Sequence, residues 1–357
     1  MAEEKKQKTI KLSIILSLTI SIAIIILILY FTIDANIIQQ LSTANIKYEF
    51  FILAILLNIL YWFLWGARLK VLANAIDRKV KISFIESTKI VITNMFLAGI
   101  TPSMAGGEPV RIYLLNKDGM SIGCSTAAVL GERLIDAIMI LVLVPFAIFI
   151  FKDKPGVEFI NLGLTIGVVV FIVLVLIFLY AIIRPDRTKS FLIYLNKKIS
   201  RFFKKKESES KIVKRINKEV DNFHSGITCF VGEKRKALFV ASVLTFLFWS
   251  TGFMIPSMIL MGLGLPPFFV ESYAAQILLL VIIMMPTTPG STGVAELGIY
   301  GLYGTLIGMS SDTLIGVFIV LYRVVTYHMN LIAGAIFQYR VFKSVASFSM
   351  DMIKKQK

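Results

Sequence analysis

Long apolar runs are the feature of this sequence that most restricts its fold. Residues 12–33 and 157–183 hold a single charged side chain between them. A run of about 20 apolar residues is what a helix needs to cross a bilayer. Lipid offers no partner for backbone N–H and C=O groups, so such runs must be helical. With 57% apolar and 17% charged residues, residues 1–357 are predicted to form one all-α polytopic membrane domain.

The basic charge of the chain fits a membrane topology. The net charge is +16, and most Lys and Arg lie between the apolar runs, as in loops that stay in the cytoplasm. This distribution argues against nucleic-acid binding. We expect a multi-pass protein of the cell membrane with both termini in the cytoplasm. The two cysteines and two histidines lack the spacing of a disulfide framework or metal site, so no metal or other cofactor is expected.

Two short stretches break apolar segments that are too short for ordinary spans. Each has a helix breaker, then small residues, then a carboxylate, which a membrane interior tolerates only beside protein or a water-filled cavity. Two such breaks, one in each half, are typical of a transporter site at a repeat interface. The residues concerned are Thr101, Pro102, Gly106, Gly107 and Glu108 in the first stretch, and Thr288, Pro289, Gly290, Gly293 and Glu296 in the second.

Charge placement predicts six crossings and two re-entrant hairpins that enter from opposite sides. Residues 50–151 and 237–337 each read as span, hairpin, span, with opposite orientation, which is an inverted repeat. The second crossing is predicted over residues 50–65, and the basic residues from Arg68 to Lys81 are placed in a cytoplasmic loop. A competing count makes each hairpin arm a full span.

The basic segment 184–236 is predicted to be cytoplasmic. Apolar residues recur there at helical spacing, for example at Phe191, Leu195, Ile216 and Val220. This pattern indicates amphipathic helices on an anionic membrane surface. A solvated linker with helical propensity fits the pattern equally well.

Ionisable side chains inside apolar segments are costly and often mark a functional site. Arg133 follows Glu108 by 25 residues and Arg323 follows Glu296 by 27, so each half places an acid at the break and an arginine on the next span. Asp136, one helical turn from Arg133, could hold its guanidinium in place. The full set of candidates is Glu108, Glu132, Arg133, Asp136, Glu296 and Arg323.

Two interpretations of these charges remain open. The acid–arginine pairs could simply lock the hairpins, or the arginines could alternate between their carboxylates and an anionic headgroup, which a guanidinium binds through two parallel hydrogen bonds. Arg111 is either a further ligand or an anchor at the membrane interface. The half-helices after Pro102 and Pro289 could aim N–H groups at an anion, although their small residues also suit close helix packing.

The breaks and the Gly131-Glu132-Arg133 span together resemble the flippase-like transmembrane family, which includes the membrane part of lysylphosphatidylglycerol synthase, the multiple peptide resistance factor. The resemblance covers residues 11–343 and implies the movement of lipids between leaflets. Larger relatives add a domain that transfers an amino acid from tRNA to phosphatidylglycerol; we expect this chain, whose sequence runs to Lys357, to lack that activity.

The leading functional prediction is a translocase for a lipid with an anionic or phosphate-containing headgroup, which passes between the two hairpins. The first alternative is an ion-coupled transporter of a small soluble anion. The second is a non-transporting membrane partner of a lipid-modifying enzyme or glycosyltransferase. The sequence shows no nucleophile with a base and no nucleotide-binding loop, so we do not expect an enzyme.

Overall fold

The fold is known from a computed structural model of the 357-residue chain. It describes residues 46–77, 80–99, 101, 106–152, 154, 184–203, 209–231, 234–283, 291, 293–308 and 312–337, with isolated positions between 169 and 183. The predicted first crossing, the tail after residue 337, and Pro102, Thr288, Pro289 and Gly290 lie outside these ranges.

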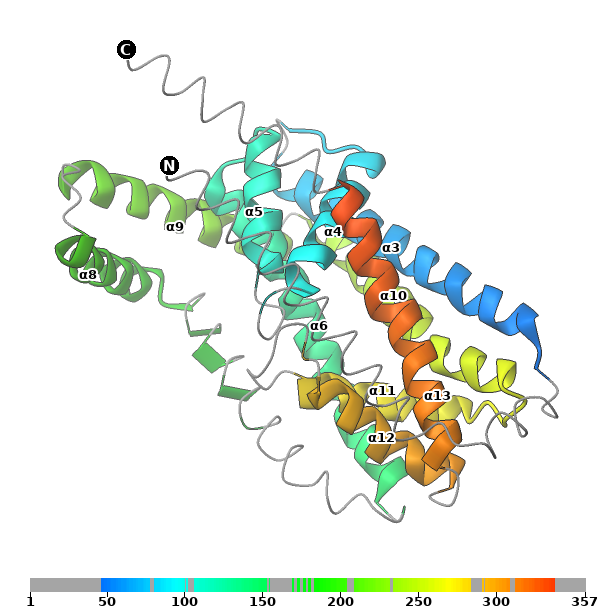
Figure 1. Cartoon of the computed structure of the whole chain (residues 1–357). Helices are drawn as coiled ribbons and strands as arrows, with labels where there is room; N and C mark the ends of the chain where they lie inside the picture. Colours follow the sequence, from blue (N-terminus) through cyan, green and yellow to red (C-terminus); the bar gives the residue numbers. More distant parts are fainter. Residues whose placement is uncertain are drawn as a thin grey trace.

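Four long apolar helices dominate the described part of the chain, which contains no β-strand (Figure 1). They are α3 (Tyr48–Ile76), α6 (Ile122–Phe151), α10 (Arg235–Gly262) and a continuous helix over Leu314–Phe337. The last of these comprises most of α13 (Asp312–Arg323), the π-helical turn η2 (Val324–His328) and the turns beyond it. With 24 to 30 residues each, and about 1.5 Å of rise per residue, all four are long enough to cross a bilayer. The prediction of an all-α membrane protein is confirmed.

Four helices of 16 residues or fewer form two pairs, one between α3 and α6 and the other between α10 and the last long helix. They are α4 (Phe84–Gly99), α5 (Gly107–Lys117), α11 (Phe269–Ile283) and α12 (Val294–Ile307). The longest has 16 residues and extends about 24 Å, less than the roughly 30 Å of a hydrocarbon core. α4 packs against α5, and α11 packs against α12. The order long, short, short, long therefore occurs twice along the chain.

The first break is held by side chains of its own motif. The Thr101 hydroxyl donates to the carbonyl of Leu97 at 2.8 Å and accepts from the N–H of Gly106 at 2.9 Å, so it ties the end of α4 to the start of α5. A Cβ at Gly107 would lie 2.3 Å from Oδ1 of Asn94. A larger residue at this position would require the Asn94 side chain to move, so glycine favours the close approach of α5 to α4.

α3 and α10 run side by side and form the most extensive helix pair of the structure (Figure 1). Aromatic rings fill part of the contact: Tyr61 stacks on Phe248 with ring centroids 4.1 Å apart, and the Trp65 ring lies 5.3 Å from that of Phe248. Phe248 is 1% exposed. Such pairs stabilise a contact beyond the area that they bury, so α3 and α10 give the polar side chains between them a fixed frame.

α3 extends past the predicted end of its span, and this corrects the sequence analysis. The helix continues from residue 65 to Ile76, so Arg68 and Lys70 belong to it and not to a loop. Arg68 is 1% exposed. A count of basic residues does not detect that a carboxylate on another helix, Glu132, neutralises Arg68.

The predicted helices of the basic segment are present as α8 (Pro185–Phe203) and α9 (Glu209–Val231), and α8 lies apart from the four long helices (Figure 1). α9 packs against α6, where Oε2 of Glu219 accepts the N–H of Gly123 at 2.6 Å. Protein thus covers the apolar side of α9 at Ile227. On α8, Phe191 and Tyr194 are 60% and 63% exposed, so α8 keeps an apolar side facing outward.

Candidate functional site

Three helices bring acidic and basic side chains together in a mostly buried group, which we call the charge cluster. Residues three or four positions apart share one face of a helix, as Glu108 and Arg111 do on one helix and Glu132 and Asp136 on another. Arg133 directly follows Glu132 and is therefore rotated about 100° from it around the helix axis. The charge cluster consists of Arg68 from α3, Glu108 and Arg111 from α5, and Glu132, Arg133 and Asp136 from α6.

Arg68 is the centre of the charge cluster. Its Nε lies 3.1 Å from Oε1 of Glu132, and its Nη1 lies 2.5 Å from Oδ1 of Asp136. The same Nη1 donates to the Thr245 hydroxyl at 3.2 Å, and the guanidinium lies 4.8 Å from the ring centroid of Phe248. Arg68 therefore connects α3, α6 and α10.

Both carboxylates beside Arg68 have further donors. Asp136 accepts a hydrogen bond from the indole N–H of Trp249 at 2.8 Å. The other oxygen of Glu132 accepts from Nη1 of Arg111. Side chains of Arg111 and Glu132 are both 0% exposed. Arg111 is therefore the partner of a buried acid in this conformation.

The predicted pair of Glu108 and Arg133 is present at the outer end of the charge cluster. Oε1 of Glu108 accepts from Nε of Arg133 at 2.8 Å and from Nη2 at 2.5 Å. Nη1 of Arg133 lies 3.7 Å from Oδ2 of Asp136, as expected for residues one turn apart. The Arg133 side chain is 40% exposed and that of Glu108 is 24% exposed, so this pair is reachable from outside the protein.

The second predicted pair, Glu296 and Arg323, is also present but far less accessible. Nε of Arg323 lies 2.8 Å from Oε1 of Glu296, with side-chain exposures of 6% and 9%. The Arg323 guanidinium covers the Tyr327 ring at 4.0 Å from its centroid. This pair joins α12 to α13 and is held between them.

At each break, one backbone N–H group just before the following helix donates a hydrogen bond to a side chain of the protein. Glu296 accepts the Gly293 N–H through Oε2 at 2.5 Å, where Gly293 has a φ of 92°. The Gly106 N–H donates to Thr101. These two N–H groups are therefore bonded within the protein in this conformation.

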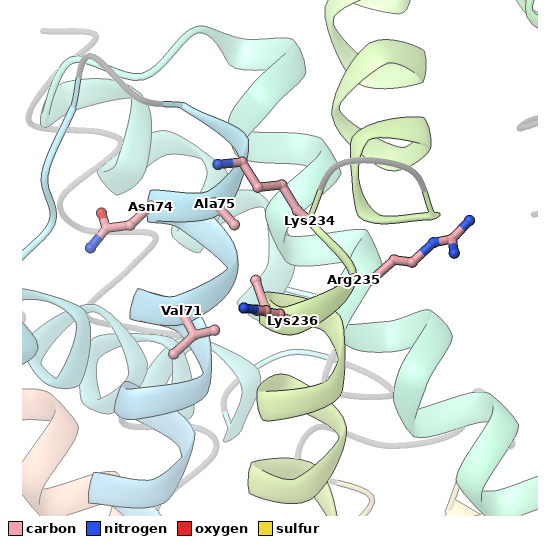
Figure 2. A pocket seen from close by; sticks show the side chains of 7 residues that line it. Val71, Asn74, Ala75, Lys234, Arg235 and Lys236 are labelled. Atoms are coloured by element: carbon pink, nitrogen blue, oxygen red, sulfur yellow. The ribbon is translucent and has the colours of Figure 1, made fainter.

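A hollow of about 620 Å³ lies between α3 and the first turn of α10. In Figure 2, Lys234 and Lys236 extend toward α3, whereas Arg235 points away from it. Thr245, which contacts Arg68, lies eight residues beyond Ala237 of the hollow, about 12 Å along α10. Buried Leu72 and Ala241 pack together on α3 and α10 between these levels. The hollow is a basic surface site separate from the charge cluster.

The arrangement suits reversible binding of an anion. A guanidinium that donates two N–H groups to a carboxylate, as Arg133 does to Glu108, can donate them to a phosphate in the same way. Among the described residues there is no group of three or more His, Cys, Asp or Glu side chains that could hold a metal ion.

Comparison with known proteins identifies the family. A family profile described as the lysylphosphatidylglycerol synthase TM region matches residues 14–334, nearly the whole chain. The chain belongs to this family. No solved structure gives a significant match.

Archaeal relatives of this family member are named only as membrane proteins. A UPF0104 membrane protein of Archaeoglobus fulgidus is 35% identical over 298 residues, which are 82% of this chain and 87% of the relative. A UPF0104 membrane protein of Methanothermobacter thermautotrophicus is 25% identical over 226 residues, 62% of this chain and 65% of the relative. Membrane localisation is thus supported by the family and by the long apolar helices.

The sequence placed three of the six members of the charge cluster, Glu108, Arg133 and Asp136, in a pair or beside it, and gave no partner for Glu132 or Arg111. Arg68 was missed, because its predicted span ended three residues earlier. The signal that could have found it is the apolar pattern of Leu69, Leu72, Ala73 and Ile76, which continues the helix past Arg68. In this member of the lysylphosphatidylglycerol synthase TM region family, α3 is therefore part of the candidate site.

Proposed function

We propose that this protein translocates a lipid with an anionic, phosphate-containing headgroup between the two leaflets of the cell membrane. The headgroup passes the pair of Arg133 and Glu108 while the hydrocarbon chains stay in the bilayer. The observation that carries this proposal is the gradient of exposure across the charge cluster. It rises from 1% and 0% at Arg68 and Glu132 to 40% at Arg133.

The difference in exposure matters because it separates residues that hold the helices together from a residue that can bind a ligand. Removing one partner from a fully buried ion pair leaves an uncompensated charge, so Arg68 and Glu132 are suited to a fixed role. Arg133 can change partners at its exposed side without uncovering its neighbours. It lies 11 residues into α6, about 16 Å from the helix start. A charge reachable at that depth of a spanning helix requires a polar environment.

The same reasoning gives Arg323 a different role from Arg133. Its pair with Glu296 is almost closed to the outside, and Glu296 also caps α12. We propose that this pair has a structural role and holds α12 and α13 together in the second half of the chain. The binding residues of the proposal are therefore Arg133 and Glu108, with Asp136 and Arg111 behind them.

The proposed architecture has six crossings and two re-entrant helix pairs, α4–α5 and α11–α12, in an inverted repeat with both termini in the cytoplasm. It is supported by the twofold occurrence of long, short, short, long helices and by the shortness of the paired helices. Such repeats place the transported ligand near the bilayer midplane. The proposed activity is transport without covalent chemistry.

The test is lipid translocation by purified protein in proteoliposomes. Wild-type protein should move a fluorescent anionic phospholipid between leaflets faster than protein-free vesicles do. Arg133→Lys keeps the charge but loses the planar fork. We expect the rate to fall about tenfold to a hundredfold, since a hydrogen bond to a charged group contributes about 1.5–3 kcal/mol. The melting temperature should change little.

Arg323→Lys is the matched control, because it makes the same change in the closed pair. It should retain most of the lipid translocation that Arg133→Lys loses. Flux of inorganic phosphate measured in the same vesicles distinguishes the soluble-anion alternative. Phosphate flux without lipid movement would refute the lipid translocase, and equal loss in both arginine variants would refute the specific role of Arg133.

A further inference from the structure

One oxygen of Glu108 lies between two guanidinium groups. Oε1 accepts from Nε and Nη2 of Arg133 at 2.8 and 2.5 Å, and the same oxygen lies 3.9 Å from Nη2 of Arg111. Glu108 stands in the first turn of α5, directly after the break, and its side chain is 24% exposed. It is thus the carboxylate of the charge cluster that is most open to the outside.

Buried donors of Arg111 and Trp65 have no hydrogen-bond acceptor among the residues that the structure describes. Arg111 is completely buried, yet its Nε and Nη2 form no hydrogen bond with any described residue. The indole N–H of Trp65, whose ring lies 5.2 Å from the Arg111 guanidinium, is also buried and forms no hydrogen bond in the described part of the chain. Buried donors are almost always satisfied in folded proteins. Their presence here indicates that a further oxygen acceptor belongs next to Arg111.

The charges of the cluster indicate how much negative charge that acceptor carries. Three arginines face three carboxylates, so the charge cluster is neutral. Glu132 is held by Arg68 and Arg111, and Asp136 by Arg68 and Trp249. Glu108 is the acid that can leave without breaking these contacts. When it leaves, one positive charge remains, and a ligand with a single negative charge restores neutrality.

We propose that the Glu108 carboxylate occupies the place of a substrate phosphodiester and that the lipid headgroup displaces it. The inference rests on the proposed function and narrows its substrate to lipids whose headgroup carries one phosphodiester and a net charge of minus one. A phosphodiester has two oxygens that share its charge. One oxygen accepts hydrogen bonds from Nε and Nη2 of Arg133, and the other accepts from Nε and Nη2 of Arg111. Glu108 acts as an internal competitor for the substrate.

The test measures binding, so that its outcome is independent of transport. Glu108→Gln removes the competing charge and leaves the arginines in place. Binding of short-chain phosphatidylglycerol to purified protein, followed by calorimetry, should tighten about tenfold or more relative to wild type, because close charge pairs couple strongly. Short-chain phosphatidylcholine, with no net charge, should bind equally to both proteins. Glu86→Gln is the matched control, since Glu86 pairs with Lys89 at the exposed start of α4, and it should bind like wild type.

Glu108→Asp provides a second variant that keeps the charge. Its shorter side chain reaches Arg133 less well, so its affinity for phosphatidylglycerol should fall between wild type and Glu108→Gln. This order can be measured even if the Gln variant folds poorly. Unchanged or weaker binding in both variants would overturn the inference, as would equal tightening for phosphatidylcholine. Equal tightening for inorganic phosphate would show a soluble anion in place of a lipid. If lipid translocation still depends on Arg133 in any of these cases, the proposed function stands and only the role of Glu108 fails.

Discussion

At the scale of single residues, Arg68 determines the geometry of the charge cluster. It contacts Glu132, Asp136 and Thr245 at once and is 1% exposed. A buried ion pair does not by itself make a protein more stable than an apolar contact would. Its effect is to fix the positions of charges that would otherwise have several arrangements. Arg133 has the opposite character, because its 40% exposure leaves part of its guanidinium free to meet a ligand.

This contrast predicts different stability losses for two arginine-to-alanine changes. Arg68→Ala leaves two buried carboxylates without their common partner and should destabilise the protein by about 3–5 kcal/mol. Arg133→Ala acts on a partly exposed pair and should cost about 1 kcal/mol or less. Unfolding of both variants in detergent by a denaturant titration measures the difference. Equal losses would contradict the division of the charge cluster into a fixed core and an exchangeable end.

At the scale of elements, hydrogen bonds join the two halves where the last long helix has its π-helical turn. The Tyr327 hydroxyl, in the π-helical turn η2, donates to the carbonyl of Gly99 at the end of α4, 3.0 Å away. In the same turn, the carbonyl of Val325 accepts from Asn58 of α3 at 2.9 Å. A π-helical turn leaves backbone groups to find partners outside the helix, and such turns are frequent at functional sites. The hydrogen bond from Tyr327 to Gly99 therefore fixes the end of α4 relative to the last long helix.

The proposed inverted repeat predicts that its two helix pairs end on opposite sides of the membrane. Single cysteines at Asn116, at the end of α5, and at Ser310, after α12, should react with a membrane-impermeant reagent from opposite sides. Asn116 should label from the cytoplasm. The background needs Cys124 and Cys229 replaced by serine. Labelling of both positions from one side would show that the pairs do not enter the membrane from opposite faces.

At the scale of the whole molecule, the sequence predicts the class of fold and part of the site. Apolar runs are a local property, so the long helices can be read from them. The pairs Glu108–Arg133 and Glu296–Arg323 could be predicted, because each acid and arginine lie in consecutive segments. The contact of Arg68 with Glu132 joins residues 64 apart on different helices. It depends on how α3 packs against α6, which no local pattern encodes.

The solvent exposure of the two arginine side chains was the second property that the sequence could not provide. Arg133 and Arg323 stand in equivalent sequence positions, and the sequence analysis treats them alike. In the structure their side chains are 40% and 6% exposed. The difference arises from the helices that cover each arginine, and it is the reason that the proposed function gives substrate contact to Arg133 and not to Arg323.

The most direct measurement is a structure of the full-length protein in nanodiscs that contain phosphatidylglycerol. We predict headgroup density within hydrogen-bond distance of the Arg133 guanidinium, with the Glu108 side chain turned away and the contacts of Arg68 unchanged. Density for lipid only around the outer perimeter, with the Arg133–Glu108 pair intact at saturating lipid, would contradict the proposal that this pair receives the headgroup.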